Sequence, residues 1–119
     1  MRFMVVDDSQ VMRNQISKIL QGRYELVGDA SNGREALEQF RQLKPKFVTM
    51  DMTMPEMEGK ETIEAMVAED PKVRILVVSA LKDQDAAMDA LAAGAYGFLC
   101  KPFTDYELVE SIEELVSDM

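Results

Sequence analysis

The sequence has no histidine and only one cysteine, Cys100. Without histidine there is no imidazole to act as a general base, to bind a metal ion, or to activate a serine or cysteine nucleophile. A single cysteine cannot form a disulfide within the chain, which is typical of proteins in a reducing cytoplasm. Chemistry that depends on histidine is therefore excluded, and carboxylates, hydroxyl groups and amines remain.

Long hydrophobic runs and an excess of positive charge are also missing. No apolar run approaches the roughly 18–20 residues that a membrane-spanning helix needs. Met1-Arg2-Phe3 leads directly into a strand-like run, so we expect no signal peptide. The formal net charge of −9 disfavours direct binding to nucleic acid or to an anionic membrane. We therefore expect a cytoplasmic protein with neither kind of partner.

The composition that is present is that of one globular domain. The 119 residues are 47% hydrophobic, which is enough for a single core. Short β-rich runs alternate five times with segments of helical periodicity, and no linker interrupts them. This alternation predicts βαβ units and a parallel sheet covered by helices on both faces, in one α/β domain over residues 1–119. The expected strands are residues 3–6, 24–27, 47–50, 75–78 and 96–100.

Polar side chains directly follow four of these strands. Asp7 and Asp8 follow the first, Asp51 the third, Ser79 the fourth and Lys101 the fifth. All strands of a parallel sheet point the same way, and ligands of open α/β sheets bind outside the carboxyl ends of the strands. We therefore expect these five side chains to meet at one rim of the sheet.

This set of groups suits phosphoryl transfer. Three carboxylates in a small space repel one another unless a cation relieves them, and oxygen ligands suit Mg²⁺. A lysine adds a point charge that pairs with a carboxylate or with a phosphate. With the metal ion and lysine to neutralise phosphoryl oxygens, Asp51 is the expected nucleophile that forms an acyl phosphate.

Each of these residues also has an ordinary structural explanation. The Asp7-Asp8 pair alone is often only a solvated turn, and Asp51 alone is often a loop acid or a helix cap. Ser79 alone suits a turn, and Lys101 alone suits an exposed surface. Their joint placement at four strand ends is what favours a functional site.

Five short motifs together resemble the receiver domains of two-component response regulators, and the resemblance covers the whole chain. It implies a flavodoxin-like, doubly wound (βα)5 sandwich with a five-stranded parallel sheet of order 2-1-3-4-5. The motifs are Val5-Val6-Asp7-Asp8-Ser9, Asp51-Met52-Thr53-Met54-Pro55-Glu56-Met57-Glu58-Gly59, Ser79-Ala80, Gly94-Ala95 and Lys101-Pro102-Phe103.

The resemblance implies that Asp51 accepts a phosphoryl group from a histidine kinase or phosphotransfer protein. The missing histidine fits this role, because the phosphohistidine donor would then lie on the partner. The cofactor would be Mg²⁺, with Asp8 its most direct ligand. The full ligand set implied by the resemblance is Asp7, Asp8, Asp51 and the backbone carbonyl of Thr53.

The resemblance also assigns a switch and an output surface. Ser79 and Lys101 would contact phosphoryl oxygens, and the Lys101-Pro102 peptide bond would be cis. Ser79 would couple to the ring of Phe98, although simple core packing is an alternative for this ring. The target would bind the face formed by the fourth helix, fifth strand and fifth helix. The acidic side of the last helix is then either a solvated face or a contact for a basic partner.

Several functions remain open within and outside this family. A chemotaxis-type regulator that acts alone on the flagellar motor switch is favoured over a phosphorelay intermediate or the receiver of a longer transcriptional regulator. A phosphatase of the haloacid dehalogenase type is disfavoured, because Thr53 stands where a second acid is needed. A flavin-binding module is disfavoured because Asp7-Asp8 would repel its phosphate. Leucine at Leu81 cannot orient water, which predicts a long-lived phosphate unless a separate phosphatase acts.

Overall fold

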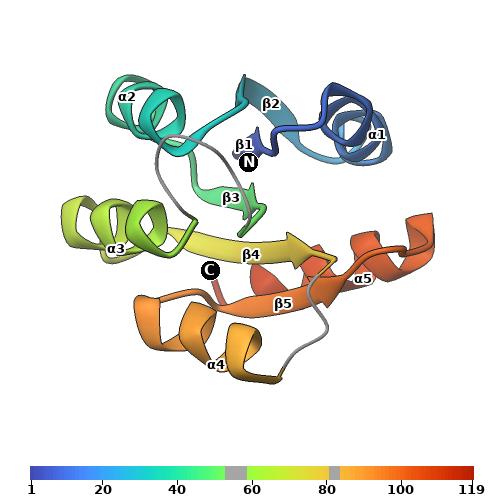
Figure 1. The fold of residues 1–119 in the computed structure, drawn as a ribbon. Coiled ribbons are helices and arrows are strands. Elements are labelled where there is room, and N and C mark those ends of the chain that lie inside the picture. The colour runs from blue at the N-terminus through green and yellow to red at the C-terminus, as the bar shows by residue number, and fades with distance from the viewer. Residues whose placement is uncertain (53–58, 81–83) are drawn as a thin grey trace.

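The computed structural model describes residues 1–52, 59–80 and 84–119, and their five strands form one parallel sheet. The strand order is β2-β1-β3-β4-β5, which confirms the expected doubly wound (βα)5 sandwich (Figure 1). Residue Thr53 and residue Leu81 lie outside the described part of the chain. The strands are β1 (Arg2–Val6), β2 (Glu25–Ala30), β3 (Phe47–Met50), β4 (Arg74–Ser79) and β5 (Gly97–Cys100).

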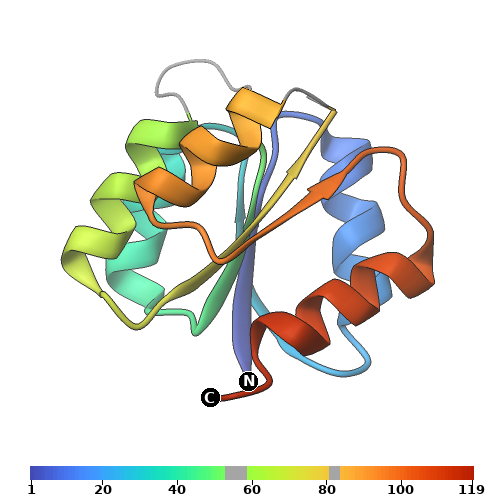
Figure 2. The ribbon, with the colours of Figure 1, turned by 90° about the horizontal axis from the view of Figure 1, so that it is seen from below.

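Five helices among the described residues cover the sheet in two layers. Figure 2 shows α2, α3 and α4 on one face and α1 and α5 on the other, as expected when each strand is followed by a crossover helix. No helix among the described residues is long and apolar enough to cross a membrane. The helices are α1 (Gln10–Leu20), α2 (Gly33–Leu43), α3 (Gly59–Glu69), α4 (Gln84–Ala93) and α5 (Asp105–Leu115).

Each strand contributes to two separate cores because successive side chains point to opposite faces of a sheet. In β1, Met4 and Val6 pack in the core beneath α2, α3 and α4. Phe3 and Val5, one residue out of phase, pack in the core beneath α1 and α5. Both faces of the interior strands are therefore buried, which is why β3 and β4 are almost continuously apolar.

Side-chain caps mark the starts of three helices among the described residues. The side chains of Ser9 and Asn32 accept hydrogen bonds from backbone amides three residues later, at the starts of α1 and α2. Thr104 and Glu107 form a complete capping box at the start of α5. Because Ser9 directly follows Asp7 and Asp8, this cap also sets the direction of the chain from the end of β1 into α1.

Four of the five described strands differ in extent from the expected ranges, β2 most of all. β2 continues to Ala30, because Asp29 pairs with Val5 and Ala30 pairs with Val6 of β1. β5 begins one residue late, at Gly97, and Tyr96 before it is 56% exposed. Smaller differences occur in β1, which begins at Arg2, and in β4, which runs from Arg74 to Ser79.

Candidate functional site

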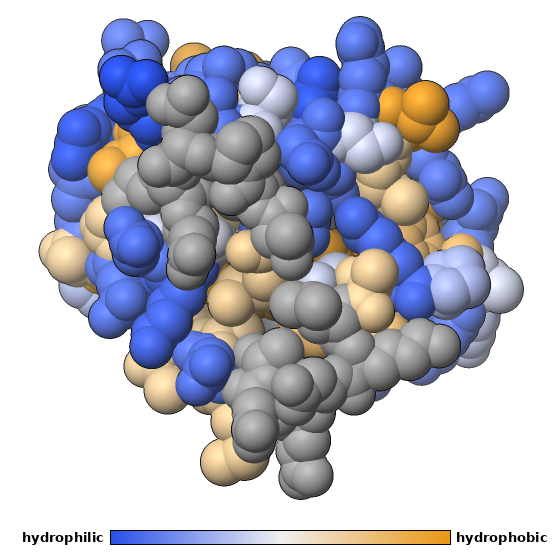
Figure 3. Space-filling model, viewed as in Figure 1, coloured by the Kyte–Doolittle hydropathy of each residue, from blue (hydrophilic) through white to orange (hydrophobic). Residues whose placement is uncertain are grey.

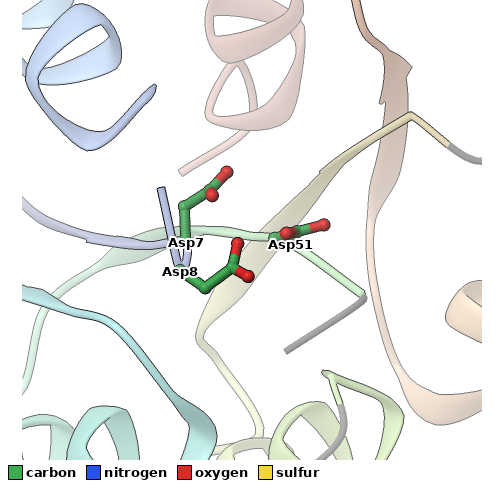
Figure 4. A group of neighbouring side chains, drawn as sticks. All are labelled: Asp7, Asp8 and Asp51. Atoms are coloured by element: carbon green, nitrogen blue, oxygen red, sulfur yellow. The ribbon is translucent and has the colours of Figure 1, made fainter. Parts of the chain in front are cut away.

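Three carboxylates meet at the carboxyl ends of β1 and β3. One oxygen from each of Asp7, Asp8 and Asp51 lies within 4.8 Å of the others, a spacing at which they could hold a metal ion. Figure 4 shows Asp7 and Asp8 leaving the end of β1 beside Asp51 at the end of β3. Asp7 and Asp51 are buried, whereas Asp8 is exposed. The cluster therefore has a fixed base and one side open to solvent.

Asp7 is held by the chain through both carboxylate oxygens. Its Oδ1 accepts a hydrogen bond from the backbone amide of Ser9 at 2.9 Å. Its Oδ2 accepts one from the Lys101 ammonium group at 2.8 Å, across 94 residues of sequence. A buried carboxylate with two such donors, one of them charged, is oriented within narrow limits.

Lys101 lies between two of the three acids. Its Nζ is 2.8 Å from Asp7 Oδ2 and 4.0 Å from Asp51 Oδ2. Its side chain is 18% exposed, so these interactions are less screened than those of a surface lysine. One ammonium group thus partly compensates three carboxylates, and the site keeps an excess of negative charge.

Asp51 is fixed at the end of β3 by its backbone. Its amide donates to the carbonyl of Val6 at 3.0 Å, which continues the pairing of β3 with β1 beyond the last strand residue. The residue is only 6% exposed. The carboxylate of Asp51 is therefore held at the rim, close to Lys101 and Asp8.

Ser79 and Lys101 are joined through the backbone. The amide of Lys101 donates to the Ser79 carbonyl at 2.9 Å, and Ser79 pairs with Cys100 across β4 and β5. Met50 pairs with Val77, so Asp51 and Ser79 both lie just beyond this pair. The Lys101-Pro102 peptide bond is cis. The structure therefore brings all five expected side chains to the same end of the sheet.

Phe98 lies on the fifth strand beneath α4. It is partly buried and packs against the core of α2, α3 and α4. This position agrees with the alternative that Phe98 is a core-packing residue. The ring is still partly accessible at the edge of the sheet. The switch role of Phe98 stays a prediction, as does the metal-ligand role of the Thr53 carbonyl.

Sequence reasoning missed Arg13, which reaches the acidic rim from α1. Its Nη1 donates to the backbone carbonyl of Asp7 at 2.6 Å, and its Nε donates to Asp29 Oδ2 at 3.0 Å. The one signal in the sequence was a basic residue in the first turn after the acidic pair. Composition and spacing cannot show that its partner is a backbone oxygen.

The arrangement suits a small, hard cation and an incoming phosphoryl group. All three candidate ligands are carboxylate oxygens, which Mg²⁺ prefers, and the exposed Asp8 leaves room for the water ligands that Mg²⁺ retains. Figure 3 shows this face of the molecule, with hydrophilic residues gathered over α1 and α2. The donor set thus fits the Mg²⁺ site that the sequence predicts.

Comparison with known proteins gives one consistent family. The family model of the response regulator receiver domain matches residues 3–113. The chain is 42% identical to the chemotaxis protein CheY of Thermotoga maritima over 96% of both chains. It is 38% identical to the chemotaxis protein CheY of Bacillus subtilis over 98% of both chains.

A solved structure of a two-protein complex contains the same fold. The chain superposes with a TM-score of 0.91 and 26% identity on a structure from Borrelia burgdorferi described as a CheX-CheY-BeF3-Mg²⁺ complex. The match covers 95% of this chain and 87% of that one. Because the family model spans nearly the whole chain and the CheY relatives align from end to end, this chain belongs to the response regulator receiver domain family and is a phosphorylation-dependent switch.

Proposed function

We propose that Asp51 accepts a phosphoryl group from the phosphohistidine of a histidine kinase or phosphotransfer protein. The observation that carries this proposal is the meeting of Asp7, Asp8 and Asp51 within 4.8 Å, with Lys101 4.0 Å from Asp51. Asp51 lies at the end of the central strand β3, near Lys101 and the open side formed by Asp8. Both carboxylate oxygens of Asp7, by contrast, already accept hydrogen bonds from Ser9 and Lys101.

The cofactor of this proposal is Mg²⁺, held by Asp7, Asp8, Asp51 and the Thr53 carbonyl. When bound, the ion supplies positive charge to phosphoryl oxygens as their charge redistributes during transfer. The Borrelia burgdorferi structure, whose description names Mg²⁺, supports this assignment. Within the chain, Asp7 remains oriented by Ser9 and Lys101, so the carboxylates need little rearrangement to accept the ion.

The chain's own groups account for the bond changes. A carboxylate oxygen of Asp51 attacks phosphorus in line with the leaving imidazole nitrogen of the partner. The phosphorus–oxygen bond forms as the phosphorus–nitrogen bond breaks, and the bonding electron pair leaves with the imidazole, which takes up a proton. Lys101 pairs with one phosphoryl oxygen, and the Ser79 hydroxyl donates to another.

The proposed output is a change at the face formed by α4, β5 and α5. Ser79 is the last residue of β4 and Phe98 lies on the adjacent strand β5, so a hydroxyl that turns toward phosphate alters the space beside the ring. Exposed apolar side chains on or directly before these elements offer a contact surface for a protein partner. They are Met88, Leu91, Tyr96 and Tyr106.

The CheY relatives, which are named as chemotaxis proteins, support a chemotaxis role. We propose that the chain acts in the cytoplasm and that its target is the flagellar motor switch. The complex described for Borrelia burgdorferi makes a CheX-like protein a further candidate partner, in keeping with the expected phosphatase. A phosphorelay intermediate and a receiver within a longer transcriptional regulator use the same site and are the alternatives. Pull-down with each partner class, with and without phosphoryl donor, separates them.

Intact mass spectrometry tests the central proposal. The protein is incubated with Mg²⁺ and a small acyl-phosphate donor, and with a phosphorylated histidine kinase. We expect one added phosphoryl group in the wild type and none in Asp51→Asn, which keeps the shape of the side chain. Addition that persists in Asp51→Asn, or no addition from either donor, contradicts the assignment.

A further inference from the structure

Arg13 joins three elements beside the acidic rim. It lies in the first turns of α1, its Nη1 donates to the Asp7 carbonyl at 2.6 Å, and its Nε donates to Asp29 Oδ2 of β2 at 3.0 Å. The Arg13 side chain is only 13% exposed, whereas that of Asp29 is 52% exposed. The planar guanidinium group thus spans from a solvent-facing acid to a backbone oxygen at the site.

Through Arg13, every hydrogen-bonding group of Asp7 has a partner within the chain. The amide donates to the Ala30 carbonyl at 3.0 Å, and the two carboxylate oxygens accept from Ser9 and Lys101. The carbonyl, the fourth group, accepts from Arg13. Asp7 is therefore fixed in rotation as well as in position.

This matters for Asp8 because the Asp7 carbonyl belongs to the peptide unit that joins the two residues. A peptide unit is planar, so holding its oxygen sets the orientation of its nitrogen and of the Asp8 Cα. The exposed Asp8 carboxylate accepts no hydrogen bond from the described residues. Within that part of the chain, backbone orientation is what places the Asp8 carboxylate beside Asp7 and Asp51.

We propose that Arg13 is a positioning residue of the metal site, which aims the Asp8 carboxylate by holding the Asp7-Asp8 peptide unit. This inference rests on the Mg²⁺ site of the proposed function. Groups that orient metal ligands in this way commonly change metal affinity by about 10–100-fold when removed. Arg13 neither binds the ion nor contacts the phosphoryl group in this assignment.

Charge and geometry predict opposite effects when Arg13 is removed. A guanidinium group near the site repels Mg²⁺, so loss of its charge alone would tighten binding. Loss of peptide orientation would weaken binding. The sign of the change in Mg²⁺ affinity therefore identifies the cause, and this sign does not depend on phosphorylation activity.

Isothermal titration calorimetry with MgCl₂ measures that sign. Arg13→Met keeps an unbranched side chain but has no donor, and we expect its Mg²⁺ affinity to fall by about tenfold in 0.5 M NaCl, where charge effects are screened. Arg13→Lys keeps the charge but lacks the planar fork, and we expect a loss of about threefold. Unchanged or tighter binding by both variants overturns the inference.

A matched control is Arg41→Met. Arg41 also donates through Nε to a carboxylate, Glu69 Oε1 at 2.7 Å, but on α2 and α3 away from the rim. This variant loses the same charge and the same kind of ion pair, and we expect its Mg²⁺ affinity to equal that of the wild type. An equal loss of Mg²⁺ affinity in Arg41→Met and Arg13→Met would mean that the loss comes from lower overall stability, and it would overturn the inference.

A double-mutant cycle with Asp8→Asn tests whether Arg13 acts through Asp8. If Arg13 acts through Asp8, Arg13→Met should change the Mg²⁺ affinity of the Asp8→Asn variant by less than about twofold. A full loss of about tenfold in the Asp8→Asn variant would mean that Arg13 acts on another group. Mg²⁺ titrations followed by NMR measure the weak affinities involved. Wild-type protein that binds no Mg²⁺ overturns this inference and the metal site together, whereas normal wild-type binding with unchanged variants overturns the inference alone.

Discussion

Among the described residues, a Lys101–Asp7 ion pair lies at the carboxyl end of the sheet and an Arg74–Asp118 ion pair at the amino end, and these two pairs differ in burial rather than in length. At the carboxyl end, Lys101 Nζ lies 2.8 Å from Asp7 Oδ2, with side chains 18% and 2% exposed. At the amino end, Arg74 Nη1 lies 2.7 Å from Asp118 Oδ1, with side chains 14% and 73% exposed. A short distance therefore says little about energy, because water can replace one partner of the second pair but not of the first.

The two ends also differ in how well their charges are matched. Arg74 donates to Asp118 and to the carbonyl of Leu115, and its guanidinium group stacks 4.2 Å from the centre of the Tyr96 ring. At the carboxyl end, Lys101 is the described base that pairs with the three clustered acids, because Arg13 beside them reaches only the Asp7 carbonyl and pairs its charge with Asp29. One end is thus arranged for stability alone, whereas the other keeps unbalanced charge that a cation can relieve.

The largest expected effect is the loss of Lys101. In Lys101→Met the apolar stem is retained, but buried Asp7 loses its charged partner beside Asp51. We expect the free energy of unfolding without Mg²⁺ to fall by about 3 kcal/mol, as for other buried pairs with one partner removed. Urea denaturation in EDTA measures it. Lys72→Met removes an exposed lysine near the amino end, and a loss no larger than in this control would contradict the comparison.

The next effect has the opposite sign. Asp8→Asn removes one charge from the acidic cluster, and we expect the free energy of unfolding in EDTA to rise by about 1 kcal/mol. The stabilisation that Mg²⁺ gives the wild type should largely disappear in this variant, since bound ligand stabilises only the folded state. Urea denaturation with and without MgCl₂ measures both. Glu38→Gln, on the exposed side of α2, should show neither change.

The third effect is local. Arg74→Met removes the contacts that hold the end of α5, and we expect a smaller loss of stability than in Lys101→Met, because Asp118 and the Leu115 carbonyl can turn to water. Hydrogen exchange should quicken in residues 115–119 while β1 and β3 stay protected. Faster exchange in the central strands would mean that the amino end supports the whole fold.

Much of the site was predictable because strand direction determines where strand ends meet. The apolar runs before Asp7, Asp51 and Lys101 predict parallel strands, and parallel strands place these three residues at one rim. Arg13 was not predictable, because its partner at the site is a backbone carbonyl, which every residue possesses. Side-chain patterns carry no information about which carbonyl an arginine will reach.

The extent of β2 was mispredicted for a related reason. Gly28 and Asp29 have low strand propensity, so the sequence predicts that the strand ends at Val27. The structure extends it because β1 pairs with both residues. The strand is also closely covered there: a Cβ at Gly28 would lie 2.5 Å from Gln39 Oε1 and 2.8 Å from Leu43 Cδ1 of α2. Close packing of α2 on β2 overrides local preference.

The smallest effect tests the amino-end pair through pH. The hydrogen bond from Arg74, and secondarily its charge, lower the pKa of Asp118 below its ordinary value of 3.8. A carboxyl group whose pKa is lowered in the folded state stabilises that state above pH 3.8, and the stabilisation is lost as pH falls through the folded-state pKa. The wild type should therefore exceed Asp118→Asn slightly in stability at pH 6.

That advantage should shrink as pH falls below 3.8, and it should be lost below the lowered folded-state pKa, where Asp118 is protonated in both states. Urea denaturation of both proteins from pH 6 to pH 3 measures the difference, and the other acids cancel because they are common to both chains. Asp118 is largely exposed, so salt at 0.5 M should also reduce the gap. A gap that is independent of pH would mean that Arg74 holds α5 through the Leu115 carbonyl and the Tyr96 ring rather than through charge.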